Sequence, residues 1–201
     1  MTSDVERPSR LEPMVPVAVV VAMAVAMWAA ELVDVPSFID LDRWGIRPRR
    51  VRGLVGVPLA PFLHSGFGHL FANTIPFLVL GAVIAIGDVG RFARVTVIVG
   101  LTSGLGVWLF AAGGSIHLGA SGLVFGYLTY LVARGVFARN VVWLAGGVLV
   151  LIVYGGILWG LLPRPGVSWT GHVFGAVGGV LAGYLLHGTR DDEPATQGVL
   201  P

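Results

Sequence analysis

Six apolar segments, each close to the length that crosses a lipid bilayer, run through this chain of 201 residues. They cover approximately residues 14–33, 66–87, 91–112, 119–137, 140–162 and 168–187. A transmembrane helix needs about 20 predominantly apolar residues, and clusters of Gly, Pro, Asn and Ser separate the last five segments from one another. Only 12% of the residues are charged, too few to coat a soluble domain of this length. The sequence therefore predicts an all-α polytopic membrane protein, a bundle of six transmembrane helices.

The chain divides into one membrane domain and two polar tails. Residues 1–13 and 188–201 are polar, and the domain is expected to span 14–187. Its first helix is expected to be retained, because the segment lacks a small-residue cleavage site and continues into Glu31 and Asp34. The long loop at about 34–65 is rich in Arg and Pro but also carries Trp44 and Phe62, so it is expected to lie on the membrane interface.

The arginines give the expected orientation. With a cytoplasmic N-terminus, seven arginines lie inside and six outside, and five of those six (43, 47, 49, 50 and 52) belong to the first loop. Apart from that loop the ratio is seven to one, which favours a cytoplasmic N-terminus. The arginines at 47–52 are expected to meet lipid phosphates or to cap loop carbonyls. A net charge of +2 is too small to indicate a nucleic-acid partner.

Polar side chains inside the apolar segments are few and fall at one membrane face. His69 and Asn73 lie on the second segment, Ser121 on the fourth and His172 on the sixth, each within the first two turns. Even-numbered helices enter the bilayer from the same side, so these four residues are expected at similar depth. Because polar groups in the membrane are costly, such a cluster predicts a functional site.

Glycines predict that the fourth and sixth helices meet closely. Gly171, Gly175, Gly179 and Gly183 repeat at every fourth position of the sixth segment, and the fourth offers Gly122 and Gly126. Small residues at this spacing let transmembrane backbones approach each other. Ser121 directly precedes Gly122 and His172 directly follows Gly171. A hydrogen bond between the serine hydroxyl and the imidazole is therefore expected.

This pair predicts nucleophilic catalysis. A serine hydroxyl needs a base to remove its proton as it attacks, and the chain contains neither lysine nor cysteine. Its acidic residues lie in loops, in tails or at helix ends, which favours a Ser121–His172 dyad over a triad. Stacking on Phe125 is expected to orient the imidazole. His69, Asn73 and the Ser121 N–H are candidate donors to an oxyanion, and Gly119 and Gly122 give a substrate backbone access.

Three motifs together resemble those of the rhomboid family of intramembrane serine proteases. The stretch from His64 to Asn73 reads HSGFGHLFAN and resembles the family's second helix, with its two histidines and asparagine. Gly-Ala-Ser-Gly at 119–122 is similar to its GxSG nucleophile motif. Gly-His-Val-Phe-Gly at 171–175 is similar to the helix of its catalytic histidine. The resemblance covers residues 14–187 and keeps the order and the helix placement of the motifs.

The resemblance implies a six-helix fold whose active site lies in a water-filled cavity, open to the outside of a bacterial plasma membrane. It implies an endopeptidase that cleaves transmembrane proteins near the ends of their helices, with lipids as its other partners and without cofactor or metal. His69, Asn73 and the Ser121 N–H would form the oxyanion hole, and His64 would brace the first loop. The structural residues near the site would be Phe125, Gly171 and Gly175.

The resemblance also implies a gate and shows three departures. Access would be gated by the fifth helix, around Tyr154 and Trp159, and by the loop 163–168. Phe125 stands where many rhomboids have tyrosine, Gly56 and its neighbours replace a Trp-Arg pair of the first loop, and Ala85 and Gly87 replace a Glu-x-Arg motif. These departures bear on loop structure and stability more than on chemistry.

Other functions remain open at this point. A catalytically inactive rhomboid-like protein would bind transmembrane clients, although such relatives typically lose the serine or the histidine. A transporter would favour acidic residues across the bilayer and matched half-repeats. A metalloprotease would need HExxH, which is absent from the sequence, and an aspartyl protease would need two membrane-embedded aspartates. His117, two residues before Gly119, is interpreted as a surface histidine.

Overall fold

The computed structural model describes residues 14–35, 39–86 and 88–188, and these ranges are predominantly helical. The two predicted tails, apart from Gly188, and Gly87 of the missing Glu-x-Arg motif lie outside the described residues. Each of the six apolar segments contains a long helix. These are α1 (Met14–Asp34), α3 (Phe67–Ala85), α4 (Val89–Phe110), α5 (Ser121–Phe137), α6 (Val141–Tyr154) and α7 (Trp169–His187).

Five of these helices are long and apolar enough to cross a membrane: α1, α3, α4, α7, and α6 together with the 3-10 helix η4 (Gly155–Leu161) that continues it. The exception is α5, which has 17 residues, slightly fewer than the roughly 20 of a typical crossing. It lies inside the bundle, where it packs against α3, α4, α6 and α7. Ser121 is the first residue of this enclosed helix.

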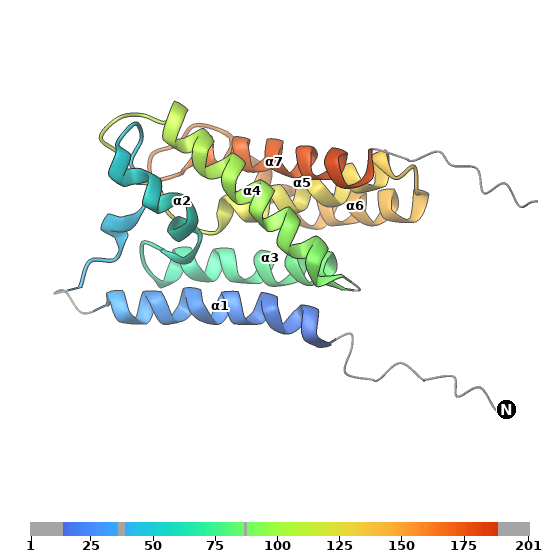
Figure 1. The fold of residues 1–201 in the computed structure, drawn as a ribbon, viewed down its shortest axis with the longest axis horizontal. Helices are drawn as coiled ribbons and strands as arrows, with labels where there is room; N and C mark the ends of the chain where they lie inside the picture. Colours follow the sequence, from blue (N-terminus) through green and yellow to red (C-terminus); the bar gives the residue numbers. More distant parts are fainter. Residues whose placement is uncertain (1–13, 36–38, 87, 189–201) are drawn as a thin grey trace, which may run out of the picture.

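The first loop is more regular than its Pro-rich sequence indicates. It contains the short helices η1 (Asp42–Trp44), η2 (Val51–Val55), α2 (Gly56–Leu59) and η3 (Ala60–Phe62). Figure 1 shows this loop at one end of the bundle, beside the turn that connects α4 to α5. Backbone bonds between Ile46 and His117, 2.8 and 2.9 Å long, join the two loops directly.

The bundle is built in two parts. Figure 1 shows α1 lying alongside α3, while α4 runs obliquely past α5 and α7. The core between them is aromatic, with the ring of Tyr127 packed against those of Phe77 and Phe92. The buried Tyr127 hydroxyl is satisfied by Thr96 on α4 at 2.8 Å, as a buried hydroxyl requires.

The predicted glycine contact between α5 and α7 is confirmed. A side chain at Gly175 would collide with the carbonyl of Gly122, and one at Gly179 would collide with that of Gly126. Thr129 on α5 also donates to the carbonyl of Ala176 on α7, at 2.8 Å. The two backbones are therefore in direct contact along several turns.

The helix α6 packs in a different way. Its first half is close to α5, because a Cβ at Gly147 would meet the Val132 backbone at 2.8 Å. Arg134 of α5 also lies over the ring of Trp143, 3.4 Å from its centre. The rest of the segment also packs against the core along one side, through the partly buried side chains of Val150, Leu151, Tyr154 and Ile157. Only 6% of the apolar window of the whole segment is fully buried, against 44% for α7. The α6–η4 segment (141–161) is thus packed along one side and exposed on the other.

Candidate active site

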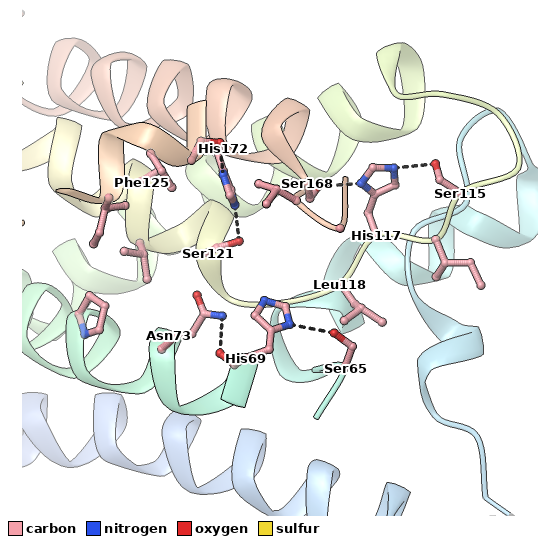
Figure 2. Close-up of a pocket in the computed structure, with 18 of the residues that line it drawn as sticks. Ser65, His69, Asn73, Ser115, His117, Leu118, Ser121, Phe125, Ser168 and His172 are labelled. Carbon is pink, nitrogen blue, oxygen red and sulfur yellow. Dashed lines mark hydrogen bonds between the residues drawn. The ribbon is translucent and has the colours of Figure 1, made fainter. Parts of the chain in front are cut away.

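A cavity of about 690 Å³ opens at the end of the bundle that carries the first loop. The predicted residues His69, Asn73, Ser121, Phe125 and His172 all line it. Figure 2 shows them converging from α3, α5 and α7. The bundle therefore brings together residues that lie up to a hundred positions apart in the sequence.

Ser121 and His172 are in direct contact. The serine Oγ lies 2.7 Å from Nε2 of His172, and Nδ1 of the same ring lies 2.7 Å from the carbonyl oxygen of Gly160 in η4 (Figure 2). A carbonyl oxygen can only accept, so Nδ1 carries the proton of the neutral ring. Nε2 is then left with a lone pair directed at the serine hydroxyl, which is the arrangement that a general base requires.

The imidazole of His172 also stacks on an aromatic ring. The Phe125 ring lies 4.4 Å from it, centre to centre, with 13° between the two planes. His172 is 7% exposed, so water reaches it mainly from the cavity. One carbonyl and one aromatic ring thus fix the orientation of the base.

His69 and Asn73 lie across the cavity from the dyad. The Asn73 amide donates one hydrogen to the carbonyl of His69 at 3.0 Å, which leaves its second hydrogen for another acceptor. The His69 ring faces Gly119, where a Cβ would come within 2.8 Å of Nε2. Gly119 also has φ +109°, a conformation that strongly favours glycine. The predicted donors therefore lie beside the Gly119–Ser121 turn.

His64 connects the first loop to the start of α5. Its Nε2 accepts from the backbone N–H of Ala120 at 3.3 Å, and the side chain is 1% exposed. Burial, with a smaller contribution from nearby His69, lowers the pKa of His64 to about 4. The ring is therefore neutral at physiological pH and able to accept this bond.

The interpretation of His117 as a surface histidine is wrong. It lines the cavity and forms two hydrogen bonds, at 2.8 Å to Ser115 Oγ and at 2.7 Å to Ser168 Oγ (Figure 2). Since the Ser115 hydroxyl donates to the carbonyl of Ala112, it accepts from His117, and Nδ1 of His117 then accepts from Ser168. This chain ties the α4–α5 turn to the residue that precedes α7.

Ser103 of α4 was not predicted as a site residue. Its hydroxyl donates to the carbonyl of Gly171 at 2.8 Å, and its Oγ also occupies the space that a side chain at Gly122 would need. Ser103 therefore wedges between the two helices of the dyad, one residue away from each member. The only sequence signal for it is a hydroxyl in an apolar helix that also carries Thr96 and Thr102, and such hydroxyls usually bond within their own helix.

Asp42 adds an acidic group to the cavity wall. Burial, followed by repulsion from Asp34, Glu31 and Asp40, raises the pKa of its carboxyl to about 6. Among the residues that the structure describes, no three His, Asp or Glu side chains are grouped so as to hold a metal ion. The polar groups of the cavity are thus hydroxyl, imidazole, amide and carboxyl groups.

The apolar helices make this chain a helical membrane protein, and a Ser–His pair lies in a cavity near one end of its bundle. The Rhomboid domain model matches residues 52–189. Similar proteins are uncharacterized ones from Mycobacterium tuberculosis and Mycobacterium bovis, each 47% identical over 80% of this chain and 70% of their own length. A third, uncharacterized and from Mycobacterium leprae, is 41% identical over 91% of this chain and 76% of its own. The chain belongs to the rhomboid family and is an integral membrane protein.

Proposed function

We propose that this protein is an intramembrane serine endopeptidase that cleaves transmembrane proteins through a Ser121–His172 dyad. The observation that carries the proposal is the pair of bonds on His172, 2.7 Å to Ser121 Oγ and 2.7 Å to the Gly160 carbonyl. A merely structural serine would not need an imidazole with its free lone pair directed at the hydroxyl. The geometry is that of a nucleophile, a base and a group that orients the base.

The reaction would proceed in two steps. Ser121 Oγ attacks the scissile carbonyl as Nε2 of His172 takes its proton, and the protonated imidazole then gives that proton to the leaving amine. In the second step His172 takes a proton from the water that attacks the acyl-enzyme, and it then gives that proton to Ser121 Oγ as the carboxylic acid product leaves. The proton on Nδ1 stays on the ring throughout, donated in a hydrogen bond to the Gly160 carbonyl, so each step involves only the other nitrogen, Nε2.

The oxyanion would lie between α3 and the start of α5. The Ser121 N–H belongs to the first turn of α5, where amides have no acceptor within the helix. The free hydrogen of the Asn73 amide and the His69 ring face the same turn. Each donor of this kind is worth up to about 3 kcal/mol in a transition state.

Six membrane crossings with a cytoplasmic N-terminus in a bacterial plasma membrane are part of the proposal. In that arrangement α5 is the fourth crossing, and the cavity opens to the outer side. The short α5 is compatible with this, because it is enclosed by longer helices that face the lipid.

The decisive experiment is labelling of the purified protein with a fluorophosphonate, followed by mass mapping of the modified residue. Label is expected on Ser121 and is expected to disappear in Ser121→Ala and in His172→Ala. Both variants are also expected to abolish cleavage of a membrane-anchored reporter while keeping the thermal midpoint of the parent protein. An unlabelled but folded parent protein that still retains transmembrane clients would support the inactive rhomboid-like alternative.

Asn73→Ala tests the oxyanion assignment separately. Loss of one of several donors is expected to lower kcat by ten- to a hundredfold without removing activity. The rate is measured on the reporter, with KM determined in the same series. An Asn73→Ala enzyme with full kcat would contradict the assignment.

A further inference from the structure

A second cavity, of about 580 Å³, lies beside the first and is lined by arginines. Its wall consists of Arg47, Arg50 and Arg52 with Pro48 and Val51 from the first loop, and of the turn 114–116 that leads toward α5. We call it the arginine pocket. Ser115 and Ile116 line both cavities, so one short turn separates the arginine pocket from the dyad.

One arginine of this loop, Arg49, has a structural role, unlike the three arginines that line the pocket. Arg49 has φ +55°, and its guanidinium donates to the carbonyls of Leu109 and Ala111 at 3.1 and 2.8 Å. It thereby caps the C-terminus of α4 and offsets the partial negative charge there. The guanidiniums of Arg47, Arg50 and Arg52 are not needed for this cap and lie on exposed residues around the pocket.

The backbone around the pocket is held in place. Trp108 of α4 donates from its indole to the carbonyl of Arg50 at 2.9 Å, and the N–H of Arg49 donates to the carbonyl of Trp108 at 2.9 Å. The bridge between Ile46 and His117 fixes the other side. Three like charges thus converge on a frame that is organised without any ligand, an arrangement that favours an anion.

Arg47, Arg50 and Arg52 form no ion pair with an acidic side chain of the described residues. Both ion pairs in this part of the chain involve Asp88, which precedes α4 at the opposite end of that helix. Guanidinium groups match the oxygens of a phosphate in two-point hydrogen bonds. We propose that the arginine pocket is a phosphate-binding site.

The neighbouring side chains favour a lipid phosphate as the source. Val51, Leu54 and Val55 are 82, 37 and 46% exposed, on the same short helix η2 that carries Arg52. Apolar side chains of this kind enter the edge of the bilayer while arginines remain at the headgroups. An anionic headgroup here would also account for three of the five arginines in this loop, on the membrane side where the distribution of charge otherwise disfavours them.

The test uses full-length Ser121→Ala, so that it does not depend on proteolytic activity. Native mass spectrometry of this protein with equimolar phosphatidylglycerol and phosphatidylcholine counts the lipids that remain bound. Phosphatidylglycerol is expected to be retained at least fivefold better than phosphatidylcholine. The added triple substitution Arg47→Gln, Arg50→Gln and Arg52→Gln is expected to remove this preference.

Two further arms complete the experiment. The matched control carries Arg43→Gln and Arg164→Gln, two exposed arginines that do not line the pocket, and is expected to keep the preference. A different result would assign the pocket to free phosphate: both lipids are retained equally, and inorganic phosphate binds only to the protein with intact arginines. The proposal is overturned if the triple variant, with an unchanged thermal midpoint, binds phosphatidylglycerol and inorganic phosphate as its parent does. It is likewise overturned if the pocket retains a soluble acidic peptide and no phosphate compound.

Discussion

The two segments joined by the His172–Gly160 hydrogen bond, α7 and α6–η4, differ sharply in how they pack against the rest of the bundle. α7, which carries His172, is in backbone contact with α5 through Gly175 and Gly179, and Ser103 fills the joint with α4. The α6–η4 segment, which carries the Gly160 carbonyl, is anchored near Trp143 and Gly147 but has only 6% of its apolar window buried. The nucleophile and base thus belong to a rigid unit, while the group that orients the base belongs to a loose one.

The difference indicates a division of labour in the proposed protease. A dyad has to keep its geometry to within a few tenths of an ångström, which the glycine contacts provide. A substrate helix needs a wall that can be displaced, and such walls come from the least stable parts of a fold. The α6–η4 segment would then be the displaceable wall, because so little of it is fully buried.

The largest effect is expected from bulky substitutions in the rigid unit. Gly175→Leu would place a side chain into the carbonyl of Gly122, and should destabilise the protein by about 3 kcal/mol or prevent folding. Gly146→Leu is the matched control, because a Cβ on Gly146 meets nothing within 4 Å. Thermal midpoints in detergent measure both. Similar midpoints for the two variants would contradict the contrast between rigid and loose regions.

Gly160→Ala tests the loose side. A Cβ there would lie 3.0 Å from Nδ1 of His172 and 3.1 Å from Cζ of Phe125, so the ring or the backbone must shift. We expect kcat to fall about tenfold, equivalent to about 1.4 kcal/mol, with little change in thermal midpoint. Gly156→Ala, which meets nothing within 4 Å, should keep its rate. Equal rates for the two variants would show that the Gly160 carbonyl does not position the base.

His64 makes the stability of the rigid unit depend on pH. Its pKa is about 4 in the folded protein, against 6.5 for a histidine free of such burial, so the unfolded chain binds the proton more readily. Stability is therefore complete above pH 6.5 and is lost as the pH falls toward 4. Between pH 7 and 5.5 the loss from this residue should be about 1 kcal/mol.

The measurement compares unfolding midpoints of the parent protein and of His64→Gln across that range. The variant is expected to be less stable at pH 7 but to show a smaller decline on acidification. Parallel curves for the two proteins would show that His64 does not cause the loss of stability at low pH.

The smallest effect is expected at His117, which ties the α4–α5 turn to Ser168, the residue that precedes α7. His117→Phe keeps an aromatic ring but loses both hydrogen bonds, and should lower kcat two- to fivefold because the start of α7 is less well held. His117→Gln offers a donor and an acceptor and should restore part of the rate. A His117→Phe enzyme that differs from the parent only in KM would instead place this residue in substrate binding.

Much of the rigid region could be predicted from the sequence, and little of the loose one. Helix lengths, the glycine spacing and the common depth of Ser121 and His172 follow from periodicity and topology, which are local properties of the sequence. The bonds of Ser103 to Gly171, of His117 to Ser168 and of His172 to Gly160 join a side chain to a distant residue, often to its backbone. Every residue has a backbone carbonyl, so the sequence does not distinguish the one at Gly160. The short helices of the first loop depend likewise on contacts with α4.

The bond between Gly160 and His172 links access to reactivity. In the proposed protease, displacing η4 to admit a transmembrane segment would remove the acceptor of Nδ1. Either nitrogen of the imidazole could then hold the proton, and fewer molecules would have a basic nitrogen facing the hydroxyl. Full activity would return only when the wall closes around the segment. Helices that touch the opening briefly would leave uncut, and those that unwind and stay would be cut. Substrates would then be distinguished by how long they stay in the opening, without a side chain that recognises their sequence.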